Sequence, residues 1–149
     1  MKVLIAGSRG FTDYTLLASK MNTILSESTE EITIISGTAP GADRLGERYA
    51  EENGLYLVRM PAEWDKLGKS AGFKRNVAMA QVATHAVIFW DGQSAGTSHM
   101  IAQCRKKGIP TRVIDSTQRA RALAEHQAEL DQALEDIICR CIDGDCHCI

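Results

Sequence analysis

Three short segments of this sequence combine glycine with hydroxyl-bearing or charged side chains, a combination suited to phosphate binding. They are GSRGFTD (7–13), SGTAPGAD (36–43) and WDGQSAGTSHM (90–100). Glycine lets the backbone approach a ligand closely, and each segment precedes a helical pattern whose free N–H groups attract anions. A single loop of this kind is also an ordinary turn of an α/β protein. The occurrence of three such loops is what favours a ligand site.

None of the three segments matches a known nucleotide motif of fixed spacing. They lack the Gly-Lys-Ser/Thr ending of a P-loop and the Gly-x-Gly-x-x-Gly spacing of a dinucleotide fingerprint. We expect a phosphate between the helix starts at Gly41 and Gly96. Arg9 or Arg75 would pair with it, because a guanidinium offers two parallel N–H groups to a phosphate.

A fourth segment, residues 61–80, places an aromatic ring among cations in what the sequence predicts to be a polar loop. Trp64 is either a buried capping aromatic or a ring that stacks on a base or ribose. Lys69 and Arg75 could reach a phosphate. Asn76 could recognise a polar edge of the ligand.

Four of the five cysteines crowd the last eleven residues, at Cys139, Cys141, Cys146 and Cys148. The residues DGD between the two pairs favour a turn, and a hairpin there would bring four thiolates together, as zinc requires. His147 is an alternative ligand. The Cys-x-Cys spacing suits a soft-metal cluster or a redox pair equally well, and a disordered end is a further reading. The fifth cysteine, Cys104, is expected in the core.

The elements that must position these side chains alternate along the chain. Apolar runs predict strands at 2–6, 32–36, 55–60, 85–90 and 109–114. Helical spacing predicts helices at 13–27, 41–53, 69–83, 96–107 and 117–138. Strands that are almost continuously apolar are typical of a parallel sheet covered on both faces. The sequence therefore predicts a doubly wound, Rossmann-like α/β domain whose strand-to-helix turns share the carboxyl edge of the sheet.

Composition excludes some classes of protein. The chain has 149 residues, of which 44% are hydrophobic and 24% charged, as expected for one globular domain. Its net charge of −2 argues against a nucleic acid as partner, since sequence-independent binding of nucleic acid needs a basic surface. The sequence has neither a membrane-length apolar run nor a signal peptide. We expect a cytoplasmic protein with no membrane partner.

Four motifs, in order and spacing, resemble those of the YspA-like proteins: GSRGFTD, SGTAPGAD, PAEWDKLGKSAGFKRNVAMA and FWDGQSAGTSHMI. That family is one branch of the SLOG superfamily, which also includes the Lonely Guy phosphoribohydrolases and the DNA-processing proteins of transformation. The resemblance implies that residues 1–115 form a Rossmann-like domain that binds nucleotides or nucleotide-derived ligands, such as ADP-ribose-like signals. A C-terminal helix (116–138) and a cysteine-rich tail (139–149) would follow it.

Carried over by position, the resemblance assigns glycines and polar residues of each motif to the ligand loops. The residue chemistry above adds Trp64, Lys69, Asp91 and Ser94. The predicted ligand-binding residues are Gly7, Ser8, Arg9, Gly37, Gly41, Asp43, Trp64, Lys69, Arg75, Asn76, Asp91, Ser94, Gly96 and Thr97.

One position departs from the Lonely Guy pattern. Those enzymes carry a Gly-Gly-x-Gly-Thr-x-x-Glu loop, whose Glu works with the Arg of the middle helix to cleave the base from ribose phosphate. Met100 stands at the position of that Glu, and a thioether can neither take up a proton nor stabilise an oxocarbenium-like centre. His99 precedes Met100 in the sequence, but on a helix its side chain points about 100° away from that of Met100. Asp13, Asp43 and Asp91 remain as carboxylates that a hydrolytic mechanism could use.

These observations favour a protein that binds a nucleotide-derived small molecule and senses or sequesters it. The competing hypothesis is a nucleosidase or phosphoribohydrolase that acts on a nucleoside monophosphate. Single-stranded DNA binding is disfavoured by the acidic balance. No cofactor is expected to be required, zinc at the tail is one of the open alternatives, and assembly into a homo-oligomer stays open.

Overall fold

The structure is a computed structural model that describes the backbone of residues 1–142 and the side chains of residues 1–139. The chain divides into two units, Met1–Ser116 and Thr117–Ile149. The first unit alternates strands and helices, and the second contains the helix α6 (Gln118–Ile142). No helix within residues 1–142 is long and apolar enough to cross a membrane.

Five parallel strands form one sheet in the order β3-β2-β1-β4-β5. The strands are β1 (Lys2–Gly7), β2 (Thr33–Ser36), β3 (Tyr56–Arg59), β4 (His85–Trp90) and β5 (Thr111–Asp115). Every neighbouring pair is parallel, and β1 pairs with β2 on one side and with β4 on the other. The predicted doubly wound α/β fold with a five-stranded parallel sheet is confirmed.

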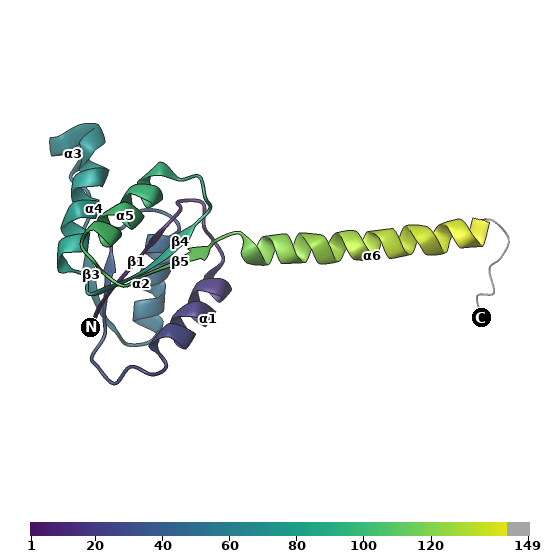
Figure 1. Cartoon of the computed structure of the whole chain (residues 1–149), viewed down its shortest axis with the longest axis horizontal. Coiled ribbons are helices and arrows are strands. Elements are labelled where there is room, and N and C mark those ends of the chain that lie inside the picture. Colours follow the sequence, from purple (N-terminus) through teal and green to yellow (C-terminus); the bar gives the residue numbers. More distant parts are fainter. Residues whose placement is uncertain (143–149) are drawn as a thin grey trace. The chain divides into compact units, whose positions relative to one another are not determined.

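Helices cover both faces of the sheet (Figure 1). The helices α1 (Tyr14–Leu25) and α2 (Ala42–Glu52) lie on one face, and α4 (Ala71–Val82) and α5 (Ala95–Lys106) lie on the other. The short helix α3 (Trp64–Leu67) and a 3-10 turn, η1 (Gly68–Ser70), precede α4. The prediction of a polar loop around Trp64 is wrong, because the backbone N–H groups of Lys66 and Leu67 both donate to the Glu63 carbonyl and close one helical turn.

The core explains why the strands are apolar along their whole length. Val3 and Ile5 of β1 pack under α1 and α2, whereas Leu4 and Ala6 pack under α4 and α5. Both faces of the strand are therefore withdrawn from water, as in other parallel sheets. Cys104 is fully buried in the cluster under α4 and α5, as predicted.

The strand order places a crevice at the carboxyl edge of the sheet. After β1 the chain crosses to β2 on one side, whereas after β4 it crosses to β5 on the other. Loops that leave neighbouring strands in opposite directions open a crevice between them, where ligands of doubly wound proteins bind. The loops after β1, β2 and β4 contain the three glycine-rich segments.

Ser8, directly after β1, ties these three loops together. Its N–H donates to the Phe89 carbonyl at 2.9 Å, and its Oγ accepts from the Asp91 N–H at 3.2 Å. Its carbonyl accepts from the N–H of Ala42 at 3.4 Å, at the start of α2. Ser8 is buried, so these bonds form away from competing water.

Gly41 lets the second loop close on the first. Its φ is +84°, and a Cβ there would lie 2.3 Å from the Ser8 carbonyl oxygen and 2.5 Å from that of Arg9. Any other residue would combine an unfavourable backbone conformation with overlap against main-chain atoms.

Gly41→Ala should therefore lower the free energy of unfolding by about 3 kcal/mol or more. Gly54→Ala is the matched control, because Gly54 also has a positive φ (+64°) but no atom lies within 4 Å of the added methyl group. The control should cost about 1–2 kcal/mol. Urea denaturation followed by circular dichroism compares the two variants. Equal losses would contradict the close contact between the loops.

Candidate functional site

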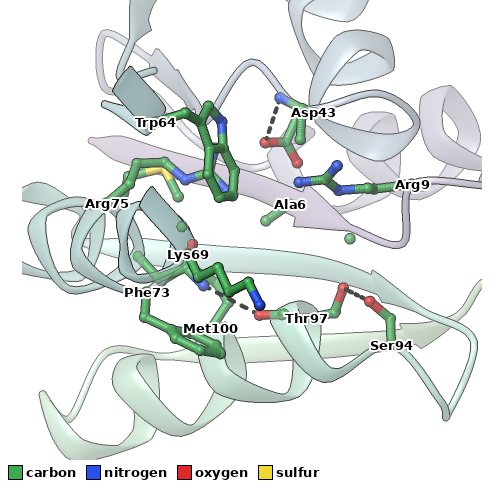
Figure 2. A pocket seen from close by; sticks show the side chains of 16 residues that line it. Ala6, Arg9, Asp43, Trp64, Lys69, Phe73, Arg75, Ser94, Thr97 and Met100 are labelled. Atoms are coloured by element: carbon green, nitrogen blue, oxygen red, sulfur yellow. Dashed lines mark hydrogen bonds between the residues drawn. The ribbon is translucent and has the colours of Figure 1, made fainter. Parts of the chain in front are cut away.

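An open pocket lies at the carboxyl edge of the sheet, between the three loops and the η1–α4 segment, with a volume of about 170 Å³. Figure 2 shows charged, aromatic and hydroxyl-bearing side chains around it. Ten of the predicted ligand-binding residues line the pocket: Gly7, Arg9, Asp43, Trp64, Lys69, Arg75, Asn76, Ser94, Gly96 and Thr97. Residues that lie up to 90 positions apart in the sequence thus meet at one place.

The other four predicted residues lie beside the pocket and shape it. Ser8 and Gly41 hold the loops together, as described above. Asp91 folds the third loop, because its Oδ1 accepts from the N–H groups of Gln93 at 2.9 Å and Ser94 at 2.8 Å. These bonds to the ionised form hold the pKa of Asp91 below its usual range. Gly37 separates two charged groups of the pocket wall.

Asp43 brings a buried carboxyl group to this wall. It lies in the first turn of α2, its side chain is almost fully buried, and its Oδ2 accepts from the Ala39 N–H at 3.3 Å. Burial raises the pKa of Asp43 to about 6, and the nearby positive charge of Arg75 only partly offsets this effect. Near neutral pH, Asp43 is therefore an acceptor that a small change of pH turns into a donor.

Glu47, one turn further along α2, is also buried but has a different environment. Its carboxylate accepts hydrogen bonds from Ser36 at 2.8 Å and from Arg59 at 3.0 Å, and Arg44 lies at 3.3 Å. Burial acts to raise the pKa of Glu47, but these bonds hold it below the usual value. Glu47 is thus a fully paired structural carboxylate, whereas Asp43 faces the pocket with fewer partners.

Arg75 of α4 lies across Gly37 from Asp43. Its Nη1 donates to the Gly37 carbonyl at 2.5 Å, whereas its Nε is buried and has no hydrogen-bond partner among the described residues. A Cβ at position 37 would lie 2.7 Å from Asp43 Oδ2 and 3.0 Å from Arg75 Cζ, so glycine is needed between them. Burial lowers the pKa of Arg75, and repulsion from Arg9 lowers it further.

The pocket carries an excess of positive charge in a chain whose net charge is −2. Arg9, Lys69 and Arg75 line it, whereas Asp43 is the single carboxylate among the lining residues. Within the described part of the chain, none of these three cations forms an ion pair. Three cations against one carboxylate give the pocket a net positive charge, which attracts an anionic ligand.

Two large aromatic side chains border the pocket and stay accessible. Trp64 is 49% exposed and Phe73 is 48% exposed. The Arg9 guanidinium lies 5.9 Å from the centre of the Trp64 ring, and Gly72 leaves room for that ring, since a Cβ there would lie 3.2 Å from its Cη2. Exposed aromatic rings beside cations can stack on a nucleotide base.

The N-terminus of α5 opens toward the same pocket. It has no side-chain cap, and a Cβ at Gly96 would meet no atom within 4 Å, so its free N–H groups are accessible. The Thr97 hydroxyl donates to Ser94 Oγ at 3.1 Å, which leaves the proton of Ser94 available for a ligand. At the start of α2, in contrast, the Ala42 N–H already donates to the Ser8 carbonyl.

Asn76 supports this helix end from α4. Its side chain is buried, and its Nδ2 donates to the Gly96 carbonyl at 3.2 Å and lies 3.2 Å from His99 Nδ1. Burial lowers the pKa of His99, which favours the neutral ring that can accept this bond. The amide nitrogen of Asn76 thus positions α5, and recognition of a ligand edge by Asn76 stays a prediction.

The floor of the pocket is apolar, and it includes Met79, which the sequence analysis missed, as well as Met100. Met79 and Met100 are buried there beside Ala6. Phe73, which the sequence analysis also missed, and Met79 lie on the same face of α4 as Asn76, because the three residues follow one another at steps of three. This helical spacing around the predicted residue Asn76 is the signal that could have found them. Asp13 does not line the pocket, because its carboxylate caps α1 through the Leu16 N–H at 3.0 Å.

The structure describes only the first residues of the cysteine-rich tail. Cys139 is exposed on α6, which continues through the backbone of Cys141, whereas Cys146 and Cys148 lie outside the described residues. No group of three or more His, Cys, Asp or Glu side chains that could bind a metal occurs in the part that the structure describes. The hairpin and its zinc ion remain predictions.

Comparisons with known proteins agree with this architecture. The sequence model of the YspA, cpYpsA-related SLOG family matches residues 1–67. Gene 61 protein of Mycobacterium phage D29 is 31% identical over 115 residues, which are 73% of this chain and 92% of the phage protein.

A solved structure, DNA processing protein A (DprA) from Streptococcus pneumoniae, has a TM-score of 0.61 to this chain at 17% identity. The match covers 84% of this chain but only 56% of DprA, so this chain spans little more than half of that protein's length. At this identity the likeness shows a shared fold.

Asp43→Asn should change how stability depends on pH. The pKa of about 6 in the folded protein exceeds the value near 3.9 of an unfolded Asp, so the folded state binds more protons between these values. Asp43 therefore destabilises the wild type as pH rises from 4 to 6, by up to about 3 kcal/mol. The stability of Asp43→Asn relative to the wild type should rise by this amount between pH 4 and pH 7. Urea denaturation at several pH values measures it, and a constant difference would contradict the raised pKa.

Proposed function

This chain belongs to the YspA, cpYpsA-related SLOG family, and from that premise we propose that it binds a phosphorylated nucleotide derivative in the pocket and holds it without cleaving it. Membership of this family suggests binding or processing of a nucleotide-related ligand. The finer statement, a ligand resembling ADP-ribose or a nucleoside phosphate that is sensed or sequestered, is our proposal. It draws on the chemistry of the lining side chains.

One observation carries this proposal: three cations without ion pairs meet beside an uncapped helix N-terminus. Arg9, Lys69 and Arg75 line the pocket, and the first turn of α5 opens into it. Both features favour a multiply charged anion such as a phosphate. The overall acidic charge of the chain makes this local excess more significant, because a generally basic surface does not explain it.

The remaining groups suit the rest of a nucleotide. A phosphate at the N–H groups of Gly96 and Thr97 would lie within reach of the cations. The ionised Asp43 carboxylate would accept hydrogen bonds from ribose hydroxyls or a base N–H. The accessible Trp64 ring would stack on the base, and its contact with Arg9 would couple base binding to phosphate binding.

The pocket favours retention of the ligand over its cleavage. Met100 is buried in the lining of the pocket. The motif resemblance aligns it with the catalytic Glu of the Lonely Guy enzymes. Groups that bind the phosphate and base equally in ground and transition states give affinity without turnover. This reasoning supports a sensor or a sequestering protein.

A second candidate function, hydrolysis of a nucleoside monophosphate, rests on Asp43. A buried carboxyl group with a pKa near 6, beside a guanidinium in a pocket, is suited to act as a general acid or base. Asp43 lies on α2, however, on a different element from Met100. It would have to act from another side of the ligand than the Glu of the Lonely Guy enzymes.

Removal of either guanidinium should weaken binding. We expect Arg9→Ala and Arg75→Ala each to lower the affinity for ADP-ribose or AMP by about 10- to 100-fold, because each loses a charge-assisted hydrogen bond worth about 1.5–3 kcal/mol. Arg75→Lys keeps the charge but loses the paired N–H groups and should lie between wild type and Arg75→Ala. Isothermal titration calorimetry measures these affinities.

Arg105→Ala is the control for charge alone. Arg105 is exposed at the opposite end of α5 and does not line the pocket. Its removal should leave the affinity within a factor of two or three, because charges separated by more than about 8 Å are largely screened at physiological salt. If Arg9→Ala and Arg75→Ala bind as tightly as Arg105→Ala, the ligand site lies elsewhere.

The wild-type protein should return nucleotides intact. After hours with nucleoside monophosphates, NAD and ADP-ribose, chromatography should find no more than one equivalent of free base or ribose 5-phosphate. Met100→Glu should raise any hydrolysis, because it restores a carboxylate at the position used by the Lonely Guy enzymes. Multiple turnover by the wild type, lost in both Asp43→Asn and Arg75→Ala, would instead favour the hydrolase.

A further inference from the structure

The second unit carries an apolar surface that the nucleotide pocket does not use. α6 is one unbroken helix from Gln118 to Ile142 (Figure 1). Five large aliphatic side chains on it are 47–61% exposed: Leu123, Leu130, Leu134, Ile137 and Ile138. Single exposed leucines are common on protein surfaces, but several on one helix mark a contact surface.

The spacing of these residues is that of a coiled coil. The helix presents Leu123, Gln127, Leu130, Leu134 and Ile137 at successive steps of four, three, four and three residues. This alternation repeats every seven residues and keeps the side chains in one narrow stripe along the helix. Leu123, Leu130 and Ile137 take the d positions of the heptad, and Gln127 and Leu134 take the a positions.

Polar residues outside the stripe interact with other residues of α6. Gln132 donates to Asp136 at 3.1 Å, and His126 lies 3.9 Å from Glu129. A stripe this narrow fits another helix better than a flat or wide surface. The apolar length of α6 is also too short and too often interrupted by charge to cross a membrane.

We propose that α6 pairs with α6 of a second copy of this chain as a parallel two-stranded coiled coil. Gln127 supports the identical partner and the parallel direction. Within one chain, Gln127 Nε2 donates to Asp131 Oδ1 at 2.8 Å, which leaves its second N–H and its carbonyl oxygen for a partner. In a parallel pair the two Gln127 side chains meet in one layer and can hydrogen-bond to each other through these groups. In an antiparallel pair each amide would be buried against a leucine such as Leu130. A single polar a position is a known determinant of register and strand number in coiled coils.

Side chains beside the stripe agree with this pairing. His126 occupies a g position and Asp131 the following e position, so in a parallel pair His126 of one copy lies across from Asp131 of the other. Ala133 and Ile138 make the next such pair and extend the apolar contact. Each protein dimer would carry two nucleotide pockets, and dimer formation does not depend on whether these pockets are occupied.

Analytical ultracentrifugation of the full chain at 10–200 μM tests this proposal. The wild type should sediment as a dimer of about 33 kDa, twice the chain mass of 16.3 kDa. Leu130→Lys with Leu134→Lys should give a monomer, because four lysines would meet in the seam. Ala128→Lys with Gln132→Lys adds the same charge on the outer side of α6 and should stay dimeric.

Three results would overturn the proposal: a monomeric wild type at all concentrations, a trimer or tetramer, or an equal response of the two double variants. Direction is tested with Gln127→Lys and Gln127→Glu. Each variant alone should be monomeric at neutral pH, because two like charges would meet at position 127 of the pair. An equimolar mixture of the two variants should dimerise through the Lys–Glu pair. A mixture that stays monomeric would exclude the parallel alignment.

Discussion

The pocket depends on the partly buried guanidinium of Arg75 and the buried carboxyl group of Asp43, which both lie next to Gly37. A side chain at position 37 would overlap with both Asp43 and Arg75. Neither charge is fully paired: Arg75 Nε has no partner among the described residues, and Asp43 has a pKa near 6. Such an arrangement lowers the stability of the fold, and incompletely paired charges of this kind occur chiefly at functional sites.

The rest of the fold keeps this pair in place. The crevice lies where the adjacent strands β1 and β4 end. Ser8 connects the loops after β1, β2 and β4 through hydrogen bonds of its N–H, carbonyl and hydroxyl groups. From the other side, Asn76 fixes the start of α5 through the Gly96 carbonyl. These hydrogen bonds connect the loops and helices that line the pocket, and such connections lower the entropy that binding must overcome.

Much of this architecture could be predicted from the sequence, because uninterrupted apolar runs specify a buried parallel sheet and its topology places the loops on one edge. The roles of individual loop residues were harder to predict. Ser8 and Asp91 have polar side chains suited to a ligand, but each satisfies backbone N–H groups, a role that depends on how the loops fold. Phe73 was missed because its place beside His99 follows from the packing of α5 on α4.

A crystal structure of the protein with ADP-ribose tests the central claim most directly. The account predicts a phosphate bonded to the N–H groups of Gly96 and Thr97 and to the guanidinium of Arg9 or Arg75. It also predicts that an oxygen of Asp43 lies within hydrogen-bond distance of the ribose or base. The intact ligand at another surface, with this pocket filled only by water, would contradict the assignment of the site.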